Sequence, residues 1–339
     1  MLQIIPQVDL QKYNTLAIPA SAAHFADIHT LEDLLEALAW NKERQLPLLV
    51  LGGGSNIVLG EHFPGLVLRI RLPGIEVVAE TDEHVFVRLG AGENWHRVVC
   101  HCLDFHYWGL ENLSLIPGTV GAAPMQNIGA YGVELQEVFA ELQAVEIASG
   151  VVVTFDRDAC RFGYRDSVFK NRLRDRYIIT SVTLRLYQQP RINLSYPALR
   201  DALGEGVETP TPHQISAAVC AIRSQKLPDP EKLPNVGSFF KNPVVSADTF
   251  ARLQDAYPGI VGFVIDPSQV KLAAGWLIQA AGWRGVERDG VAVHDRQALV
   301  VTNPGGKPGG DILNFAADIA MSVRQKFNLE LEMEPRVYP

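Results

Sequence analysis

The chain has 339 residues, of which 47% are hydrophobic and 20% charged, and its formal net charge is −8 at pH 7. This length suggests two or three domains, and the composition is that of a globular enzyme with a well-buried core. The acidic balance argues against nucleic acid or an acidic membrane surface as a partner, although clustered basic residues can still hold a small anion. The N-terminus lacks the pattern of a signal peptide, and no apolar stretch approaches about 18 residues, so we expect a cytoplasmic protein without a membrane span.

The first part of the chain predicts a helix, a strand and a glycine-rich turn. Thr30 caps a helix over residues 30–45, and Leu48–Leu51 reads as a buried strand that ends in Gly52-Gly53-Gly54-Ser55-Asn56. The turn has neither the P-loop spacing nor a G-x-G-x-x-G motif that opens a helix. By itself it is a weak signal for a backbone turn that faces a phosphate.

The segment Ile116–Gly132, IPGTVGAAPMQNIGAYG, holds four glycines, two prolines and three alanines. It has the periodicity of neither a helix nor a strand. Glycine reaches positive φ without steric cost, so consecutive N–H groups can turn inward and hold an anion. We interpret the segment as the floor of a large cofactor site; the alternative is a tightly packed turn of small residues.

The middle of the chain reads as a β-rich domain, and the last part as a separate α/β unit. Strands are predicted over residues 84–89, 142–147, 151–155 and 177–187, with a hairpin turn at Ser149-Gly150 and a helix from Asn94 to about Trp108. Further on, a loop with a short helix is expected over 195–207, helices over 211–224, 248–256, 268–282 and 310–327, and strands over 297–302 and 329–334.

The four cysteines form no C-x-x-C pair. Cys100-His101-Cys102 resembles a metal-binding fragment, but it lies in the predicted helix, where residues two apart point to different sides. We therefore expect free thiols and no metal site.

Three segments have residues suited to chemistry. Arg165 lies in an aromatic, glycine-containing turn, where a guanidinium can stack and bind a carboxylate with two hydrogen bonds; the alternative is a solvated basic face. Ser238 lies between a glycine and two phenylalanines, where its hydroxyl can donate a proton; the alternative is a turn over an aromatic core. The alternating glutamates of residues 330–336 favour an amphipathic edge strand when taken alone.

Together these segments resemble a known family. GGGSN, IPGTVGAAPMQNIGAYG, CRFGYRDSVFK, RSQKLPDP, VGSFFKNP and the final E-x-R are similar, in the same order, to motifs of the UDP-N-acetylenolpyruvoylglucosamine reductases. The resemblance extends from about Tyr13 to Arg336. It implies an α+β fold: an FAD-binding module of the vanillyl-alcohol-oxidase/PCMH type in two subdomains (1–70 and 71–210, the module itself about 17–189) and a C-terminal α/β substrate-binding domain (211–339).

The resemblance also implies an activity. Enzymes of this family are cytoplasmic FAD-dependent oxidoreductases that make UDP-N-acetylmuramate for peptidoglycan, and thus serve cell wall biogenesis, cell shape and cell division. NADPH reduces the flavin, which passes a hydride to the enolpyruvyl double bond of the UDP-sugar. Ser195-Tyr196-Pro197 is similar to the loop of a longer subclass, in which a tyrosine closes over the substrate. The partners implied are NADPH and the UDP-sugar, and the family suggests a monomer.

The residue roles that follow are likewise implied by the resemblance. Hydride addition leaves negative charge next to a carboxylate, so Arg165 and Glu334 would polarise the carboxylate and Ser238 would donate the proton; Glu334 must then be protonated or paired. FAD would be held by Gly52, Gly53, Gly54, Ser55, Asn56, Ile116, Pro117, Gly118, Thr119, Gly121, Gly129, Ala130 and Tyr131. The substrate would be bound by Tyr164, Tyr196, Lys226, Asn242, Gln297 and Arg336.

One departure from the family pattern bears on Glu334. The next residue is usually aliphatic but here is Pro335, which predicts that its strand lies at an edge or ends there. The chain also ends three residues after Arg336, so Glu332 is the fallback for the catalytic carboxylate. Two other functions remain open: another flavoprotein of this fold that oxidises a small alcohol or sugar and needs no grip by Lys226 and Tyr196, and a flavin- or UDP-sugar-binding regulator, in which loss of Ser238 or Arg165 would be expected.

Overall fold

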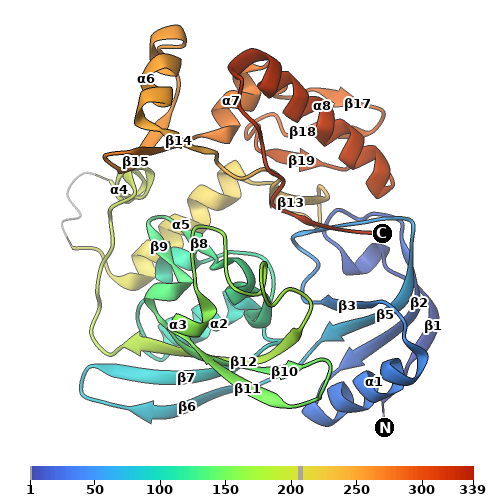
Figure 1. Cartoon of the computed structure of the whole chain (residues 1–339). Helices are drawn as coiled ribbons and strands as arrows, with labels where there is room; N and C mark the ends of the chain where they lie inside the picture. The colour runs from blue at the N-terminus through green and yellow to red at the C-terminus, as the bar shows by residue number, and fades with distance from the viewer. Residues whose placement is uncertain (1, 205–208) are drawn as a thin grey trace. The chain divides into compact units, whose positions relative to one another are not determined.

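The computed structural model describes residues 2–204 and 209–339, and the chain divides into two compact units (Figure 1). Unit 1 consists of Met1–Val8, Ala22–Gly53 and Pro64–Gln225, and unit 2 of Asp9–Ser21, Gly54–Phe63 and Lys226–Pro339. No helix within the described ranges is long and apolar enough to cross a membrane.

The first sheet of unit 1 has the strand order β1-β2-β5-β3. Its strands are β1 (Ile5–Asp9), β2 (Ser21–Ile28), β5 (His62–Ile70) and β3 (Leu48–Leu51), and β3 runs parallel to β5. Helix α1 (Leu31–Arg44) connects β2 to β3, which confirms the predicted helix and strand. A capping box explains where α1 begins, because Thr30 Oγ1 accepts from the N–H of Asp33 while the Asp33 carboxylate accepts from the N–H of Thr30.

The second sheet of unit 1 is antiparallel, in the order β11-β10-β12-β7-β6. Its strands are β11 (Val152–Asp156), β10 (Phe139–Glu146), β12 (Tyr177–Tyr187), β7 (His84–Gly90) and β6 (Ile75–Glu80). The predicted hairpin is confirmed as β10–β11, with Gly150 at φ 74° in its turn. The predicted strand 177–187 has the expected bounds.

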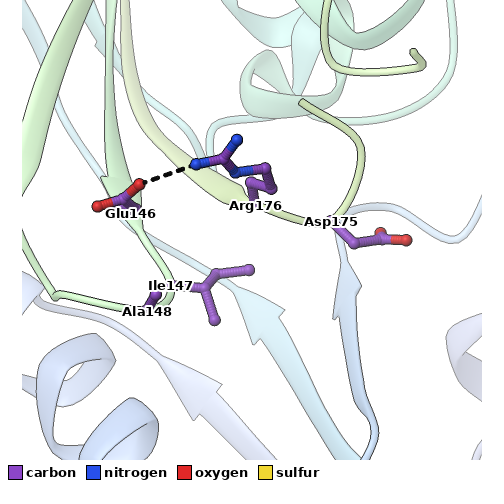
Figure 2. A pocket seen from close by; sticks show the side chains of 5 residues that line it. All are labelled: Glu146, Ile147, Ala148, Asp175 and Arg176. Carbon is purple, nitrogen blue, oxygen red and sulfur yellow. Dashed lines mark hydrogen bonds and ion pairs between the residues drawn. The ribbon is translucent and has the colours of Figure 1, made fainter. Parts of the chain in front are cut away.

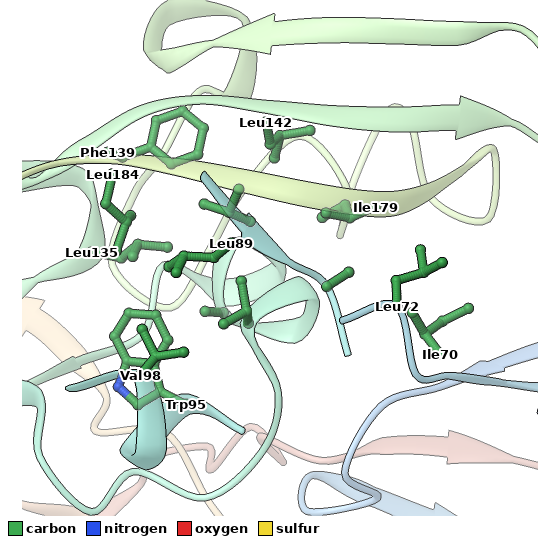
Figure 3. Close-up of a cluster of buried hydrophobic side chains, with 14 of the residues drawn as sticks. Ile70, Leu72, Leu89, Trp95, Val98, Leu135, Phe139, Leu142, Ile179 and Leu184 are labelled. Carbon is green, nitrogen blue, oxygen red and sulfur yellow. The ribbon is translucent and has the colours of Figure 1, made fainter. Parts of the chain in front are cut away.

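The hydrophobic core of unit 1 joins both sheets to helix α2 (Trp95–Asp104) (Figure 3). Val85, Val87 and Leu89 are fully buried because alternate residues of β7 face the same side. Trp95 belongs to the same buried cluster, and its indole N–H donates to the carbonyl oxygen of Leu113 at 3.0 Å. Helix α2 begins within one residue of the predicted start, with Asn94 as its cap, but ends at Asp104, four residues earlier than expected.

The remaining helices and strands complete unit 1. They are the 3-10 helices η2 (Glu111–Leu113), η3 (Val120–Gln126) and η4 (Leu135–Glu137), strands β8 (Gly129–Ala130) and β9 (Val133–Glu134), and helices α3 (Arg157–Cys160), α4 (Pro197–Leu203) and α5 (Pro212–Lys226). The expectation that 116–132 contains neither helix nor strand is wrong, because η3 and β8 lie within it; a 3-10 helix tolerates its glycines and Pro124 over a short run. Helix α4 confirms the helix expected in 195–207, of which 205–207 lie outside the described residues.

Unit 2 contains three sheets, with orders β13-β19-β18-β17, β14-β16-β15 and β20-β4. The strands are β13 (Asn235–Ser238), β19 (Val300–Thr302), β18 (Val291–Val293), β17 (Glu287–Arg288), β14 (Val244–Ser246), β16 (Gln269–Leu272), β15 (Gly262–Asp266), β20 (Arg336–Tyr338) and β4 (Ile57–Leu59). The helices are η1 (Gln11–Tyr13), α6 (Ala247–Ala256), α7 (Ala274–Ala280) and α8 (Gly309–Phe327).

Two predictions for unit 2 are wrong and two are confirmed. The helix expected over 268–282 is the strand β16 followed by α7, because residues 269–272 pair with both β14 and β15. The strand expected over 329–334 is absent, and the strand β20 begins just after Pro335 instead. Proline has no backbone N–H to donate to a neighbouring strand. Helices α6 and α8 match the expected 248–256 and 310–327 within one residue.

Candidate active site

The two glycine-rich turns meet in unit 1. A Cβ atom placed on Gly53 would lie 2.9 Å from Gly118 Cα, and one on Gly52 would lie 2.6 Å from Thr119 Oγ1. Any side chain at these two positions would therefore push the turns apart. Both turns contain residues predicted to contact the flavin, and at these positions they lie against each other.

Hydrogen-bond donors lie free at this junction. Among the described residues, the N–H groups of Gly53, Gly118 and Thr119 find no acceptor. Gly53 is exposed and the other two are half-buried, so a bound molecule can reach these donors. Free N–H groups on adjacent backbone turns suit the phosphate and carbonyl oxygens of a dinucleotide such as FAD, so the chain fits this cofactor.

Arg165 is held against the second glycine-rich segment. Its Nη2 donates to the carbonyl oxygen of Gly129 at 2.7 Å, and its guanidinium lies 5.7 Å from the ring of Tyr164. Its backbone is left-handed, at φ 51°. The basic side chains further along this run, Arg172, Arg174 and Arg176, are exposed, as a solvated face requires.

Tyr131 and Tyr196 lie together in unit 1, with ring centroids 5.2 Å apart in an edge-on arrangement. The Nε of Arg223 in α5 donates to the carbonyl oxygen of Leu115 at 3.1 Å, and the charge of Arg223 acts on the Tyr131 hydroxyl. Burial raises the pKa of the Tyr131 hydroxyl and lowers the pKa of Arg223.

Arg223 is the polar residue that the sequence interpretation missed at this place. Burial is the main cause that lowers the pKa of Arg223, and the positive charge of Arg165 lowers this pKa further. The only sequence signal was the position of Arg223 in RSQKLPDP, three residues before Lys226.

The segments that contain Ser238 and Glu334 are neighbours in unit 2, joined by a main-chain hydrogen bond. Ser238 ends strand β13 opposite Val300, and the N–H of Glu334 donates to the carbonyl oxygen of Phe239 at 2.9 Å. The two phenylalanines that follow Ser238 are buried, while Ser238 and Glu334 stay half-exposed. The serine hydroxyl is thus supported by an aromatic core and still accessible to a ligand.

The fallback residue Glu332 has a different environment. Its carboxylate pairs with Lys241 Nζ, and its carbonyl oxygen accepts from the N–H of Lys241 at 2.9 Å. Its side chain is 71% exposed. Glu332 is therefore an ion-pair partner at the surface, whereas Glu334 is the carboxylate joined to the Ser238 strand.

The remaining proposed substrate residues lie in unit 2, in different settings. Arg336 pairs with Ile57 and donates its N–H to the carbonyl oxygen of Asn56 at 3.0 Å, next to the first glycine-rich turn. Asn242 Oδ1 accepts from the N–H of Ala274 at the start of α7. Gln297 Oε1 lies 2.9 Å from where a Cβ of Gly275 would be, and Lys226 is exposed.

The structure thus groups the predicted residues within each unit. Unit 1 holds Arg165, Tyr164, Tyr131, Tyr196, Gly52, Gly53 and the proposed flavin contacts of residues 116–130; unit 2 holds Ser238, Glu334, Lys226, Asn242, Gln297, Arg336 and Gly54–Asn56.

Two other features lie outside this site. The four thiols are free, and the described residues contain no group of three or more His, Cys, Asp or Glu side chains arranged to hold a metal. A surface cavity of about 160 Å³ lies between Glu146 and Asp175 (Figure 2). Its Glu146 carboxylate already pairs with Arg176 at 3.4 Å and accepts from Ser149 at 2.7 Å, so it offers little to a ligand.

Comparison with known families defines the class of protein. The model for an FAD binding domain matches residues 22–156, which include both glycine-rich segments, Gly52–Asn56 and Ile116–Gly132. The model for the UDP-N-acetylenolpyruvoylglucosamine reductase C-terminal domain matches residues 229–338, which include Ser238 and Glu334. The fold and these two regions are those of an FAD-dependent oxidoreductase.

Full-length relatives identify the family. UDP-N-acetylenolpyruvoylglucosamine reductases from Pseudomonas syringae pv. syringae and Pseudomonas aeruginosa are 46% and 48% identical to this chain, each over 99% of both sequences. The crystal structure of the Thermus caldophilus reductase superposes with a TM-score of 0.70 at 23% identity, over 100% of both chains, and so shows the shared α+β fold. The chain belongs to the UDP-N-acetylenolpyruvoylglucosamine reductase family, whose flavin-dependent enzymes act in peptidoglycan synthesis.

Proposed function

We propose that this enzyme uses NADPH and FAD to reduce UDP-N-acetylenolpyruvoylglucosamine to UDP-N-acetylmuramate in the cytoplasm, as a monomer. The observation that supports the proposal is the main-chain hydrogen bond from Glu334 to Phe239, the residue after Ser238, which brings the two segments with these residues next to each other. Membership of the family supports the substrate. In this proposal residues 1–210 form the FAD-binding part and 211–339 the substrate-binding part.

Backbone groups hold the cofactor. The free N–H groups of Gly53, Gly118 and Thr119 would bind its oxygens, with Tyr131 at the end of the same segment. Bound FAD supplies the hydride, which it receives from NADPH. The glycines contribute close approach rather than reactive side chains, so the chemistry must come from residues elsewhere.

The side chains answer the two demands of adding hydride to an enolpyruvyl group. Negative charge develops on the carbon next to the carboxylate and spreads into it, so Arg165 would bind this carboxylate, and protonated Glu334 would donate to it. Ser238 would donate the proton that completes the reduction. Lys226 and Tyr196 would bind the diphosphate, with Asn242, Gln297, Arg336 and Tyr164 lining the rest of the substrate site.

Anaerobic stepwise mixing tests the proposal. The purified protein should be yellow, NADPH should bleach it, and the enolpyruvyl UDP-sugar should restore the colour with formation of UDP-N-acetylmuramate. A small sugar or alcohol that reduces the flavin would instead indicate an oxidase of the same fold. Absence of flavin, or no reoxidation by the UDP-sugar, would contradict the proposal.

A further inference from the structure

Hydrogen bonds between two segments of unit 1 converge on the side chain of Asn127, which is completely buried. Asn127 Nδ2 donates to Glu134 Oε2 at 2.8 Å and to the carbonyl oxygen of Gly163 at 3.1 Å. Asn127 Oδ1 accepts from the N–H of Gln136 at 3.0 Å. Both ends of this amide are therefore satisfied by groups of fixed position, which gives the amide one defined orientation.

The hydrogen bond from Asn127 to Gly163 attaches to the turn that contains Arg165. Gly163 and Asp166 exchange backbone hydrogen bonds of 3.1 and 3.2 Å, and Arg165 lies between them in the left-handed conformation at φ 51°. For a residue with a side chain this conformation costs on the order of 1–3 kcal/mol, so the surroundings must hold it. The hydrogen bond from Asn127 to the carbonyl oxygen of Gly163 is one such restraint.

The guanidinium end of Arg165 depends on the same residue through the main chain. Arg165 Nη2 donates to the carbonyl oxygen of Gly129, two residues after Asn127. Asn127 itself is left-handed, at φ 46°, and so sets the direction in which the chain leaves toward Gly129. The backbone of Asn127 thus sets the position of the Gly129 carbonyl oxygen, which accepts from the Arg165 guanidinium. The side chain of Asn127 holds the main-chain turn of Arg165 through Gly163.

We infer that Asn127 is the positioning residue for Arg165, holding the guanidinium where it meets the substrate carboxylate. The inference rests on the proposed function, because that function gives Arg165 its role. Two further bonds attach the same turn, from Ser167 Oγ to the carbonyl oxygen of Met125 at 2.7 Å and from Lys170 Nζ to the carbonyl oxygen of Arg165 at 3.2 Å. Loss of the Asn127 bond alone therefore misplaces the turn without releasing it.

The test variant is Asn127→Asp. Aspartate has nearly the same size, tolerates the left-handed backbone and keeps an acceptor for Gln136, but it cannot donate to Gly163 and it repels Glu134. Misplacement of a substrate-orienting group can cost about a hundredfold in rate, so we expect turnover with the UDP-sugar to fall about ten- to a hundredfold. The rate of flavin reduction by NADPH and the flavin content should stay near those of the wild type.

A double-mutant cycle separates positioning from general damage. If Asn127 acts through Arg165, Asn127→Asp should cost much less turnover in an Arg165→Lys background than in the wild type. Asn303→Asp is the matched control. Asn303 is also buried and donates to two carbonyl oxygens, of Leu16 at 2.9 Å and Lys307 at 3.0 Å, while accepting from the N–H of Lys307 at 2.7 Å. Its effect should be equal in both backgrounds.

The outcomes are distinct. An equal cost of Asn127→Asp in both backgrounds would overturn the inference, because the residue would then act independently of Arg165. Wild-type turnover in Arg165→Lys and Arg165→Ala would instead overturn the proposed role of Arg165. If Asn127→Asp loses its fold by circular dichroism, Glu134→Gln replaces it: it weakens the acceptor of Asn127 Nδ2, and we expect a smaller loss, of about two- to fivefold, with the same dependence on Arg165.

Discussion

The turn around Arg165 in unit 1 and the Ser238–Glu334 pair in unit 2 are positioned in different ways. Arg165 is held by side-chain hydrogen bonds, from Asn127, Ser167 and Lys170, and by its own bond to Gly129. Ser238 and Glu334 are positioned by main-chain pairing of their strand and its neighbours.

The difference predicts how each region responds to substitution. In the Ser238 and Glu334 segments the main chain sets the positions of the residues, so a side-chain substitution should lower the catalytic rate without moving its neighbours. In the turn around Arg165 side chains and glycines set the positions, so a substitution should change both the local structure and the catalytic rate.

Ser238→Ala should separate chemistry from structure most clearly. Removing a positioned proton donor typically costs about 10²–10⁴ in rate, so turnover should fall by that factor in rapid-mixing assays. Flavin reduction by NADPH and the melting temperature should not change, because strand pairing of residues 235–238 needs no serine hydroxyl. In the control Ser246→Ala, loss of the α6 cap should lower stability by about 1 kcal/mol and leave turnover unchanged. Normal turnover in Ser238→Ala would remove the proposed proton donor.

Glu334→Ala and Glu332→Ala should differ although the two residues are neighbours in one segment. Loss of a group that donates to a developing anion costs about 10²–10³ in rate, so Glu334→Ala should reduce turnover by at least about a hundredfold. Glu332→Ala removes an ion pair with Lys241 at the surface, worth at most about 1 kcal/mol, and should leave turnover within about twofold. Steady-state kinetics decides between them; the reverse order would make Glu332 the catalytic carboxylate.

Gly53→Ala should destabilise unit 1 and weaken its binding of flavin. The added Cβ would meet the backbone of Gly118, and such overpacking typically costs about 1–3 kcal/mol. We expect loss of bound flavin by absorbance and a lower melting temperature. Gly310→Ala in α8 is the matched control, because a Cβ there meets no atom within 4 Å and alanine favours the helix by about 0.5–1 kcal/mol. Full flavin content in Gly53→Ala would show that the turns need not approach so closely.

His96 should make flavin retention sensitive to pH. Its Nδ1 accepts from the N–H of Leu115 at 3.0 Å, which only an unprotonated ring nitrogen can do. Burial, and then the charge of Arg223, lower the pKa of His96 below 6.5 in the folded chain. The unfolded chain therefore takes up a proton first, so the contribution of His96 to stability is full above about pH 6.5 and decreases as the pH falls below it.

Melting temperatures and flavin release between about pH 5 and pH 8 measure this effect. In His96→Gln the melting temperature and the bound flavin should decrease less steeply as the pH falls. His294 of unit 2 also has a pKa lowered by burial, so His294→Gln should change the acid sensitivity of stability but not of flavin release. An unchanged pH profile in His96→Gln would contradict the prediction.

The sequence alone determined the local elements whose signals lie within a few residues. Thr30 and Asn94 begin their helices because each side chain bonds an N–H three residues later. The hairpin at Gly150 and the strand 177–187 follow from turn chemistry and alternation. The family motifs identified the flavin cofactor and the reductase class, because ordered sets of residues carry more information than any single turn.

Tertiary structure decided what depends on distant partners. Residues 269–272 continue a helical pattern in sequence but form a strand because β14 and β15 pair with them. Arg223 became part of the site only when α5 placed it beside Tyr131, 92 residues earlier in the chain. Asn127 reads in sequence as one polar residue in a glycine-rich loop, and only the folded chain shows its bond to Gly163. A hydrogen bond needs an oriented partner within about 3 Å, and no local pattern encodes a partner that far along the chain.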